Sequence, residues 1–493
     1  MAGAVSFAEL EGKLENEVCG VQTDSRRIQA GDIFLAVPGE TEDGAKYIDD
    51  ALARGARVIV ACKETCQALL GKLPDDVFVC EQEDMREAVA RLAQARFHTA
   101  HLPLKILGVT GTNGKTTATY LMEALLTALG EKVGVMGTVS YRWPGFSMNA
   151  PLTTPDPLVI HENLAKMQKA GVTYCVMEVS SHAILQKRVA CLPFAGAAFT
   201  NLTQDHLDFH KTMESYFAAK AKLFCELPRA DKAMAVNGDD VYGRRLLQMC
   251  PQALGFGFAK RDDLSPFLQG EILRQDTQGL SLRMHYQGRS WLLSSPLIGA
   301  FNAANLLTVQ ALALGLGFSE QDFGALGNFC GVRGRLERVE ANGRHVFVDY
   351  AHTPDALENV LKALRKAGFQ RIVALFGCGG NRDRGKRPLM GEAVAKYADV
   401  AVLTSDNPRF EDPMAIIEDV LPGLAKAREK YVEADRRLAT RLALGLVHDA
   451  HDCLLIAGKG HEDYQIIQGK RHHYSDQEVV SELSRADASI GNC

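Results

Sequence analysis

The sequence predicts a multidomain α/β protein. Its 493 residues are too many for a single hydrophobic core, and about 150 residues per domain gives two to four domains. Short apolar segments alternate with segments whose apolar residues repeat every three or four positions, which is typical of buried strands connected by helices. Polar or glycine-rich clusters follow several of the apolar segments, as in parallel sheets that bind ligands at the carboxyl ends of their strands.

The composition favours an enzyme of a reducing compartment. Hydrophobic residues make up 46% of the chain and charged residues 23%, and no apolar run approaches the ~20 residues that span a bilayer. The acidic first residues lack the basic-then-apolar pattern of a targeting signal. The 12 cysteines are scattered without CxxC pairs, which favours free thiols over a disulfide framework. Because the net charge is −5, nucleic acid is a poor candidate partner. Together these features predict a cytoplasmic protein that acts on small molecules and binds neither nucleic acid nor membrane.

Residues 1–98 form the first predicted domain. Residues 32–39 and 56–62 are predicted strands, and residues 84–97 are a predicted helix. Acidic side chains outnumber basic ones here, so an anionic ligand would depend on backbone donors and a few placed side chains.

The second predicted domain, residues 99–332, begins with the most informative stretch of the chain, GVTGTNGKTT at 108–117. It follows a short apolar strand pattern and leads into a helical pattern. Glycines allow backbone amides to turn toward a phosphate, the helix start adds partial positive charge, and Lys115 adds a full charge. The Thr116 hydroxyl is placed to hold Mg²⁺. The loop is shorter than the standard form, because Val109 stands where that form has its first glycine, but it still predicts a nucleotide site.

Two further predicted strands of this domain, residues 173–179 and 196–202, end in polar residues. Glu178 and His206 follow them and are candidate Mg²⁺ ligands, since this cation prefers a carboxylate and few dedicated protein ligands. Two plainer interpretations remain open, a buried strand-end acid for Glu178 and a helix cap for His206. The spacing of His206 and His210 also suggests a zinc hydrolase, but the glutamate of the HExxH motif is missing. A hydrophilic, antiparallel-looking stretch at 271–293 precedes a predicted helix at 302–315.

The third predicted domain, residues 333–493, resumes the strand and helix alternation as a doubly wound unit. Three polar loops follow its predicted strands, and we expect them to converge on one crevice: residues 377–387, 406–413 and 457–465.

This crevice would place the guanidinium groups of Arg382 and Arg409 beside the carboxylates of Asp406 and Glu462. Arginine binds a carboxylate bidentately and the acids would take an ammonium group, so the predicted ligand is an amino acid. A phosphate site and an amino-acid site together suggest a ligase. A carboxylate becomes reactive toward an amine when ATP converts it to an acyl phosphate.

Motifs along the whole chain resemble, in order, those of the Mur ligases: GTNGKTT (111–117), TTP (153–155), MEVSSH (177–182), FTNLTQDHLDFH (199–210), FNAANLL (301–307), VDYAHTPDAL (348–357), GCGGNRDRGKRPLMG (377–391), DNPR (406–409) and AGKGHEDYQ (457–465). The resemblance implies the three-domain Mur ligase architecture. Residues 1–98 would bind UDP, residues 99–332 would form a P-loop ATPase around a parallel sheet, and residues 333–493 would form a Rossmann-like domain that binds the amino acid.

The resemblance also implies the reaction. ATP, with Mg²⁺, would phosphorylate the D-glutamate γ-carboxyl of UDP-N-acetylmuramoyl-L-Ala-D-Glu. The amine of meso-diaminopimelate would then attack the acyl phosphate, in the synthesis of a peptidoglycan precursor. We expect a monomer.

Site residues carried over from the resemblance fall into four sets. The catalytic set is Lys115, Glu178, His206 and Lys220, and Mg²⁺ would be held by Thr116, Glu178, His206 and a carbamate on Lys220, with Lys222 as a neighbouring candidate. ATP would contact Gly111, Thr112, Asn113, Gly114, Lys115, Thr116, Thr117, Asn302, Asn305, Arg335 and Asp349. The UDP substrate would contact Thr23, Ser25, Glu40, Thr41, Glu42, Thr153, Thr154, Ser180, Gln186 and Arg188. Diaminopimelate would contact Arg382, Asp406, Asn407, Pro408, Arg409, Gly458 and Glu462.

Three details refine these expectations. Close relatives often have asparagine before the Thr-Thr pair, where this chain has Leu152. Arg409 favours diaminopimelate over lysine as the added amino acid, because lysine has no distal carboxylate for it to bind. One alternative is a folylpolyglutamate-synthase-like ligase, which should lack DNPR and the UDP domain that contains DSR at 24–26. The other is a nucleotide-gated protein without catalysis, which should have lost an activation residue.

Overall fold

The structure is a computed structural model that describes residues 3–16, 19–39, 42–69, 71–226, 228–261, 263–264 and 266–490. Its internal contacts divide the chain into two compact units. The first comprises Met1–Gly257, Arg261–Phe267 and Thr308–Asp322. The second comprises Phe258–Lys260, Leu268–Leu307 and Phe323–Cys493. Within the described ranges, no helix is long and apolar enough to cross a membrane.

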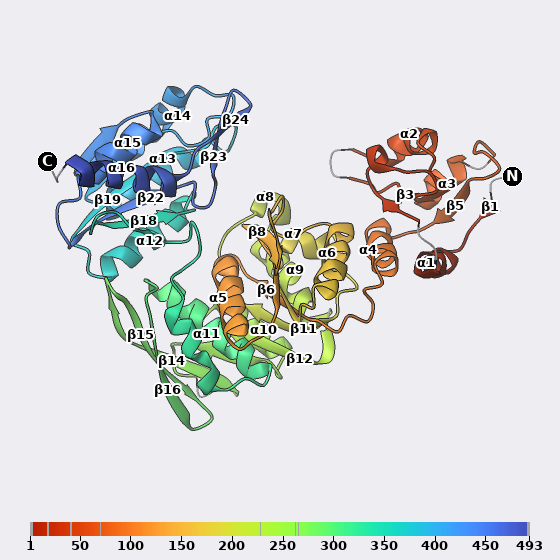
Figure 1. The fold of residues 1–493 in the computed structure, drawn as a ribbon, viewed down its shortest axis with the longest axis horizontal. Coiled ribbons are helices and arrows are strands. Elements are labelled where there is room, and N and C mark those ends of the chain that lie inside the picture. Colours follow the sequence, from red (N-terminus) through yellow and green to blue (C-terminus); the bar gives the residue numbers. More distant parts are fainter. Residues whose placement is uncertain are drawn as a thin grey trace. The chain divides into compact units, whose positions relative to one another are not determined.

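The N-terminal part of the first unit is a parallel sheet with the strand order β1-β5-β4-β3-β2. Its strands are β1 (Gly3–Ala4), β2 (Val21–Gln22), β3 (Ile33–Leu35), β4 (Val58–Ala61) and β5 (Phe78–Glu81), and its helices are α1 (Phe7–Asn16), α2 (Ile48–Ala53), α3 (Lys63–Leu69) and α4 (Met85–Arg96). Helices α1 and α4 pack against each other (Figure 1). Neighbouring residues Phe34 and Leu35 belong to different apolar clusters, as expected for a strand buried on both faces.

The predicted helix at 84–97 is confirmed, with Asp84 as its N-cap, and the strand at 56–62 is confirmed as β4. The predicted strand at 32–39 is shortened to β3. The chain turns after Leu35, where the Val37 amide donates to the Leu35 carbonyl at 3.0 Å instead of to a neighbouring strand.

The central part of the first unit has the strand order β13-β12-β11-β6-β10-β7-β8-β9, which is parallel from β13 to β7. The strands are β6 (Lys105–Thr110), β7 (Val133–Met136), β8 (Ser140–Trp143), β9 (Phe146–Asn149), β10 (Tyr174–Glu178), β11 (Phe194–Phe199), β12 (Pro228–Asn237) and β13 (Leu254–Gly257). The helices are α5 (Lys115–Ala128), α6 (Pro157–Lys169), α7 (Ser181–Leu185), α8 (Leu207–His210), α9 (Met213–Cys225) and α10 (Val241–Met249).

Strand register places the functional loops of this sheet together. Val109 of β6 lies beside Glu178 of β10, and Thr110 lies beside Phe199 of β11. The predicted strand at 196–202 is wrong at its end, because β11 stops at Phe199 and the following residues form hydrogen bonds to the glycine-rich loop.

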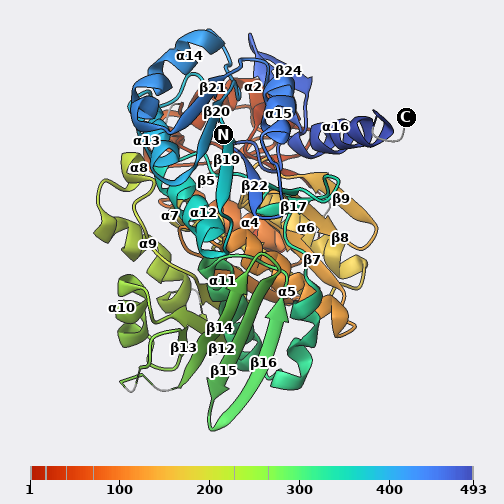
Figure 2. The ribbon, with the colours of Figure 1, turned by 90° about the vertical axis from the view of Figure 1, so that its left-hand side faces the viewer.

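In the second unit, β14 (Phe267–Asp276), β15 (Gly279–Tyr286) and β16 (Arg289–Ser295) form an antiparallel meander, which confirms the prediction for 271–293 (Figure 2). The predicted helix at 302–315 is α11 (Ala300–Gly315), of which the residues up to Leu307 belong to this unit and those from Thr308 to the first.

The C-terminal sheet has the order β17-β18-β22-β19-β20-β21 and is parallel except for β17. Its strands are β17 (Glu337–Val339), β18 (His345–Asp349), β19 (Arg371–Phe376), β20 (Val400–Leu403), β21 (Glu429–Val432) and β22 (Asp452–Ala457), and a separate hairpin comprises β23 (Tyr464–Ile467) and β24 (Lys470–His473). The helices are α12 (Pro354–Lys366), α13 (Lys386–Tyr397), α14 (Pro413–Val420), α15 (Arg436–Gly445) and α16 (Asp476–Ile490). Apolar clusters fill both faces, which confirms a doubly wound unit.

Candidate active-site regions

The glycine-rich loop between β6 and α5 has the backbone that a phosphate cradle needs. Gly111 and Gly114 have φ angles of +148° and +85°, which side-chain-bearing residues rarely adopt. A Cβ atom on Gly111 would also lie 1.9 Å from the Thr200 hydroxyl oxygen. Gly114 is the N-cap of α5, so the dipole and first-turn amides of a long helix favour an anion at this loop.

The segment after β11 braces this loop. The Thr112 amide donates to the Asn201 carbonyl at 2.8 Å, and the Asn113 amide donates to the Asn201 side-chain oxygen at 3.0 Å. The Thr203 amide in turn donates to the Thr112 hydroxyl at 3.0 Å. Sequence reasoning missed this bracing role of Asn201 and Thr203, because neither residue type nor spacing marks a contact between two separate loops.

Lys115 and Thr116 occupy the first turn of α5. The Lys115 Nζ atom donates to the carbonyls of Gly111 and Thr112 at 3.0 and 2.9 Å, so its charge lies over the loop itself. The Thr116 hydroxyl is buried and donates to Glu178 at 3.0 Å. The structure therefore brings together the predicted phosphate-binding lysine, the predicted Mg²⁺-binding hydroxyl and the predicted carboxylate.

Glu178, at the end of β10, is fully buried and accepts several hydrogen bonds. Its donors include the Thr116 hydroxyl, the Thr138 amide at 2.8 Å and the Thr138 hydroxyl at 3.0 Å. A hydroxyl and a carboxylate side by side beneath a phosphate loop are oxygen donors of the kind Mg²⁺ takes, with water and phosphate completing the shell. Among the residues described, no group of three His, Cys, Asp or Glu side chains could hold a metal.

His206 lies at the N-cap position of α8 and has a left-handed backbone, with φ of 54°. Its side chain is about half exposed and its Nε2 atom lies 3.4 Å from a carboxylate oxygen of Asp205. Its ring packs edge-on against His182 and Tyr216. The Tyr216 hydroxyl lies 3.3 Å from that of Thr112, which connects His206 to the phosphate loop through one aromatic ring.

Lys220 on α9 is a fully buried lysine. Its Nζ atom donates to the Gly111 carbonyl at 2.9 Å and lies 3.5 Å from the Thr110 hydroxyl. Burial, reinforced by the nearby Lys115 charge, lowers the pKa of Lys220 well below its usual range. A neutral amine is the form that can react with carbon dioxide to give a carbamate. Lys222, by contrast, is only partly buried and pairs with Glu226.

The residues that we expect to contact the muramoyl-dipeptide lie close together near the end of β10. The Thr154 hydroxyl donates to the Glu178 carbonyl at 2.8 Å, and the Ser180 amide donates to Thr154 at 3.0 Å. Arg188 donates to the Thr154 carbonyl at 3.0 Å and to Gln186 at 2.6 Å. Thr153 lies 3.1 Å from Thr138, hydroxyl to hydroxyl, and so completes a chain of polar contacts to Glu178.

Leu152, the departure from the family pattern, has an exposed side chain. Its backbone carbonyl accepts a hydrogen bond from the buried Tyr141 hydroxyl. The backbone therefore still ties this bend to β8.

The expected UDP residues lie in the N-terminal sheet. Thr23 is exposed after β2, and Ser25 is buried and forms a hydrogen bond that lowers the pKa of Asp50. Glu42 accepts a hydrogen bond from the Tyr47 hydroxyl. Glu40 and Thr41 lie outside the described residues.

The remaining nucleotide candidates lie in the second unit. Asn302 and Asn305 are buried on α11 and are linked by a 3.3 Å hydrogen bond. Asp349, at the end of β18, accepts bonds from the amides of Leu336 and Ala351 at 2.5 and 2.7 Å. Burial raises the pKa of Asp349, and the Arg335 charge opposes this shift.

Arg335 itself packs over the Tyr350 ring, with 4.9 Å between its guanidinium carbon and the ring centre. Its Nε atom is buried and lacks a hydrogen-bond partner within the described part of the chain. A buried guanidinium nitrogen of this kind is suited to a ligand acceptor such as a nucleotide oxygen.

The three polar loops of the C-terminal sheet converge, as predicted. They follow β19, β20 and β22, which are neighbours in the sheet. Asn407 connects two of them, because its side-chain nitrogen donates to Glu462 at 2.9 Å and its side-chain oxygen accepts from Lys459 at 3.3 Å. Pro408 follows it and is buried. Gly458 has a φ of +112°, and a Cβ atom there would lie 3.8 Å from the Asp406 carboxylate.

Both predicted arginines pass over Gly379. A Cβ atom on Gly379 would lie 2.9 Å from a guanidinium nitrogen of Arg409 and 3.9 Å from the Arg382 Cγ atom. Arg409 also donates to the Gly380 carbonyl at 2.8 Å, which fixes the guanidinium group, whereas Arg382 is exposed. The Arg409 guanidinium, held close to a glycine without a side chain, suits a carboxylate ligand.

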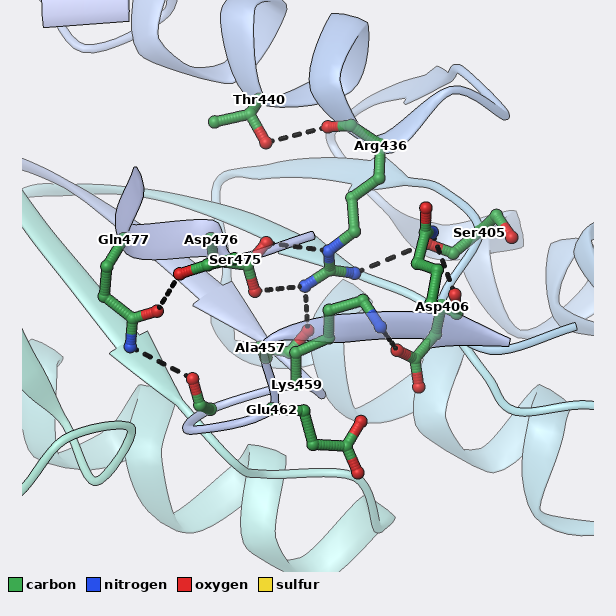
Figure 3. A network of polar contacts seen from close by, with 12 residues as sticks. Ser405, Asp406, Arg436, Thr440, Ala457, Lys459, Glu462, Ser475, Asp476 and Gln477 are labelled. Atoms are coloured by element: carbon green, nitrogen blue, oxygen red, sulfur yellow. Dashed lines mark hydrogen bonds and ion pairs between the residues drawn. The ribbon is translucent and has the colours of Figure 1, made fainter. Parts of the chain in front are cut away.

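The same loops carry two acidic groups. Asp406 is buried and its carboxylate lies 3.2 Å from the Lys459 Nζ atom (Figure 3). Burial, together with the Asp406 charge, raises the pKa of Glu462. Lys459 is a site residue that sequence reasoning missed. The only signal for it was its place within the AGKGH motif.

Profile comparisons cover most of the chain. The Mur ligase family, catalytic domain, matches residues 17–97. The Mur ligase middle domain matches residues 109–313, and the Mur ligase, glutamate ligase domain, matches residues 334–460. The chain belongs to the Mur ligase family. It has that family's three-domain α/β fold, as the resemblance implied.

Individual relatives agree with this assignment. The chain is 50% identical to a UDP-N-acetylmuramoyl-L-alanyl-D-glutamate–2,6-diaminopimelate ligase of Lawsonia intracellularis, over 97% of this chain and 98% of the relative. It is 42% identical to the protein of the same name from Aquifex aeolicus, over 96% and 95%. A solved structure of a ligase with this name superposes with a TM-score of 0.69 at 31% identity, covering 98% and 99% of the two chains.

Proposed function

We propose that the protein is an ADP-forming ligase of peptidoglycan precursor synthesis. It adds meso-2,6-diaminopimelate to the D-glutamate γ-carboxyl of UDP-N-acetylmuramoyl-L-Ala-D-Glu. The names of relatives at 42% and 50% identity over nearly the whole chain support this reaction. The observation that carries the choice of amino acid is the convergence of the C-terminal loops, where Arg409 lies close to Gly379 and Asn407 donates to Glu462. The same names favour this reaction over folylpolyglutamate synthesis.

The first step would activate the carboxylate at the loop between β6 and α5. The N-terminus of α5 and Lys115 would hold the ATP phosphates, and the substrate carboxylate would attack the γ-phosphorus while the bond to ADP breaks. Bound Mg²⁺ would neutralise charge on the phosphate oxygens. Thr116 and Glu178 fit this ion, with His206 and a Lys220 carbamate as the further expected ligands. The proposed ATP set also includes residues of both units. In the first unit these are Gly111, Thr112, Asn113, Gly114 and Thr117, and in the second they are Asn302, Asn305, Arg335 and Asp349.

The second step would form the amide. The neutral amine of diaminopimelate attacks the acyl carbon, the resulting tetrahedral intermediate expels phosphate, and the amine proton leaves to solvent. Arg382 and Arg409 would bind the distal carboxylate of the amino acid and thereby orient the attacking amine. Asp406 and Glu462 would receive the distal ammonium group, and Asn407, Pro408 and Gly458 shape the loops that carry them.

The UDP substrate would extend over the first unit. The muramoyl-dipeptide would be contacted by Thr153, Thr154, Ser180, Gln186 and Arg188. The UDP group would be approached by Thr23, Ser25 and Glu40–Glu42. We further propose domain boundaries near residues 98 and 332, a monomeric enzyme, and a cytoplasmic location where ATP is available.

Phosphate release tests the reaction and its specificity together. The assay contains ATP, Mg²⁺ and UDP-N-acetylmuramoyl-L-Ala-D-Glu, with meso-diaminopimelate or L-lysine added in parallel. We expect release with diaminopimelate only and a tripeptide product by mass spectrometry. Phosphate release with lysine instead would support a ligase reaction but contradict the proposed role of Arg409. No release with either amino acid would contradict the proposed reaction.

A further inference from the structure

Two thiols meet at the ends of α9 and α10. Cys225 is the last residue of α9 and Cys250 is the C-cap of α10, and their sulfur atoms lie 3.6 Å apart. This separation is non-bonded contact between two sulfurs, compared with about 2.05 Å in a disulfide. The two residues are 25 positions apart in the chain, so the contact results from packing of the two helices.

The two thiols differ in access. Cys225 is exposed, whereas Cys250 is buried. Burial, with the contact to Cys225, raises the pKa of Cys250 to about 11, and the Lys232 ammonium nearby opposes this rise. An oxidant can reach the exposed thiol, and the buried thiol is in contact with it. This is the arrangement of an oxidised cysteine and the second cysteine that resolves it into a disulfide.

The surroundings argue against a metal at this pair. A soft metal would need further ligands, and in the part of the chain that the structure describes no three Cys, His, Asp or Glu side chains form such a group. Lys232 is the charged neighbour that interacts with both thiols, and it donates to the Leu223 carbonyl in the last turn of α9 at 2.7 Å. Its positive charge opposes the rise in the pKa of the Cys250 thiol and disfavours a bound metal ion.

We propose that Cys225 and Cys250 form a reversible disulfide when the protein meets a peroxide. The Cys225 thiolate attacks one peroxide oxygen, the O–O bond breaks, and the leaving hydroxide takes a proton to become water, which gives a sulfenic acid. The Cys250 thiolate then attacks the Cys225 sulfur, the S–O bond breaks, and hydroxide leaves as a second water. Two thiols are oxidised and one peroxide is reduced to two waters.

The link would tie α10 to the helix that carries Lys220. Lys220 lies five positions before Cys225 on α9 and contacts the Gly111 carbonyl of the phosphate loop. The thiol chemistry itself does not depend on the proposed ligase reaction, so the two can fail separately.

Mass spectrometry of the folded, full-length protein tests the proposal. After treatment with hydrogen peroxide and blocking of the remaining thiols, non-reducing peptide mapping should give one cross-linked peptide pair containing Cys225 and Cys250. This pair should lack two hydrogen atoms and revert with dithiothreitol. Two separately blocked thiols after treatment, or over-oxidised Cys225 without the cross-link, would overturn the proposal.

Single-cysteine variants sharpen the test. Cys250→Ser should leave a sulfenic acid on Cys225 that a dimedone probe labels, whereas the wild-type protein should show little labelling because Cys250 resolves it. Cys330→Ser is the matched control, since Cys330 is also exposed but is not paired with another thiol by any described contact. It should leave the cross-link unchanged. Equal dimedone labelling of wild type and Cys250→Ser would contradict resolution by Cys250.

Discussion

Two lysine side chains share one carbonyl oxygen at the phosphate loop. Lys115 and Lys220 both donate to the Gly111 carbonyl, at 3.0 and 2.9 Å. Two ammonium groups this close repel each other, and the buried one loses its charge more easily. Lys220 is that residue, because burial and the Lys115 charge lower its pKa well below the usual range.

Lys115→Ala should lower turnover by ~10²-fold or more, because the transferred phosphoryl group loses a charge partner. Phosphate release measures the effect. Lys222→Ala is the matched control, since Lys222 is only partly buried and its one described side-chain contact is the ion pair with Glu226, and it should retain near wild-type turnover. Full activity of Lys115→Ala would remove this lysine from the phosphate site.

Lys220 also makes stability depend on pH. The pKa of Lys220 is lowered in the folded state from its ordinary value of 10.5, so below pH 10.5 the unfolded chain binds more protons than the folded one. Folding therefore becomes more favourable as the pH rises toward 10.5. Relative to Lys220→Met, the wild-type protein should therefore gain stability with a limiting slope of about 1.4 kcal/mol per pH unit.

Urea unfolding in buffers depleted of carbon dioxide, from neutral pH to about pH 10, measures this difference. Other groups titrate equally in both proteins and cancel. A difference that stays constant over this range would mean that Lys220 keeps its charge in the folded protein.

Arg409 adopts a left-handed backbone, with φ of 54°, and one guanidinium nitrogen is held by the Gly380 carbonyl. Arg409→Lys should raise the KM for diaminopimelate more than the KM for ATP, because an ammonium group cannot bind a carboxylate bidentately. Steady-state kinetics with each substrate varied in turn distinguish the two. Equal increases in both constants would place Arg409 outside the amino-acid site.

At the scale of elements, a buried ion pair joins α15 and α16 to the strand ends that carry the amino-acid site (Figure 3). Both side chains of the pair, Arg436 and Asp476, are fully buried and meet through two 2.8 Å hydrogen bonds. Arg436 also donates to the Ala457 carbonyl at 3.0 Å and contacts that of Ser405 at 3.4 Å. The pair thereby fixes the end of β22, where the AGKGH loop starts. It also fixes Ser405, which lies between the end of β20 and the DNPR loop.

Asp476→Ala should destabilise this part of the protein by about 3–5 kcal/mol, because it leaves a buried guanidinium without its carboxylate. Arg437→Ala, which removes a neighbouring but exposed ion pair with Glu482, should cost at most about 1 kcal/mol. Urea unfolding curves measure both variants. Similar losses in the two variants would show that the buried pair contributes no more than a surface contact.

At the scale of the whole molecule, the chain consists of units with their own apolar cores. The central sheet and the C-terminal sheet contribute separate buried clusters. Separate cores give separate cooperative transitions unless they are strongly coupled, so we expect each unit to have its own unfolding free energy.

Calorimetry should therefore resolve more than one transition. Diaminopimelate at about a hundred times its Kd should stabilise the unit that contains Arg409 by about 2.7 kcal/mol and raise that transition alone. Asp476→Ala, in the same unit, should lower the same transition. A single transition, or an equal shift of all transitions, would contradict independent unfolding of the units.

The sequence predicted the elements whose signal is local. The phosphate loop, α4, β4, β10, the antiparallel meander and the alternation of the C-terminal sheet follow from periodicity, glycines and caps within a few residues of one another. Strand ends were predicted less well. β3 stops early because the Val37 amide bonds back to Leu35, and β11 stops early because the next residues bond to the glycine-rich loop; such bonds leave no mark on local periodicity.

Residue type and motif thus determined the family, the fold class and the candidate site residues of this protein. Only the tertiary structure decided which groups meet. It placed the Thr116 hydroxyl on Glu178, two lysines on one carbonyl, Lys459 beside Asp406, and Cys225 against Cys250. The physical reason is that burial and long-range contact set charge state and reactivity, and neither is encoded at any single position of the chain.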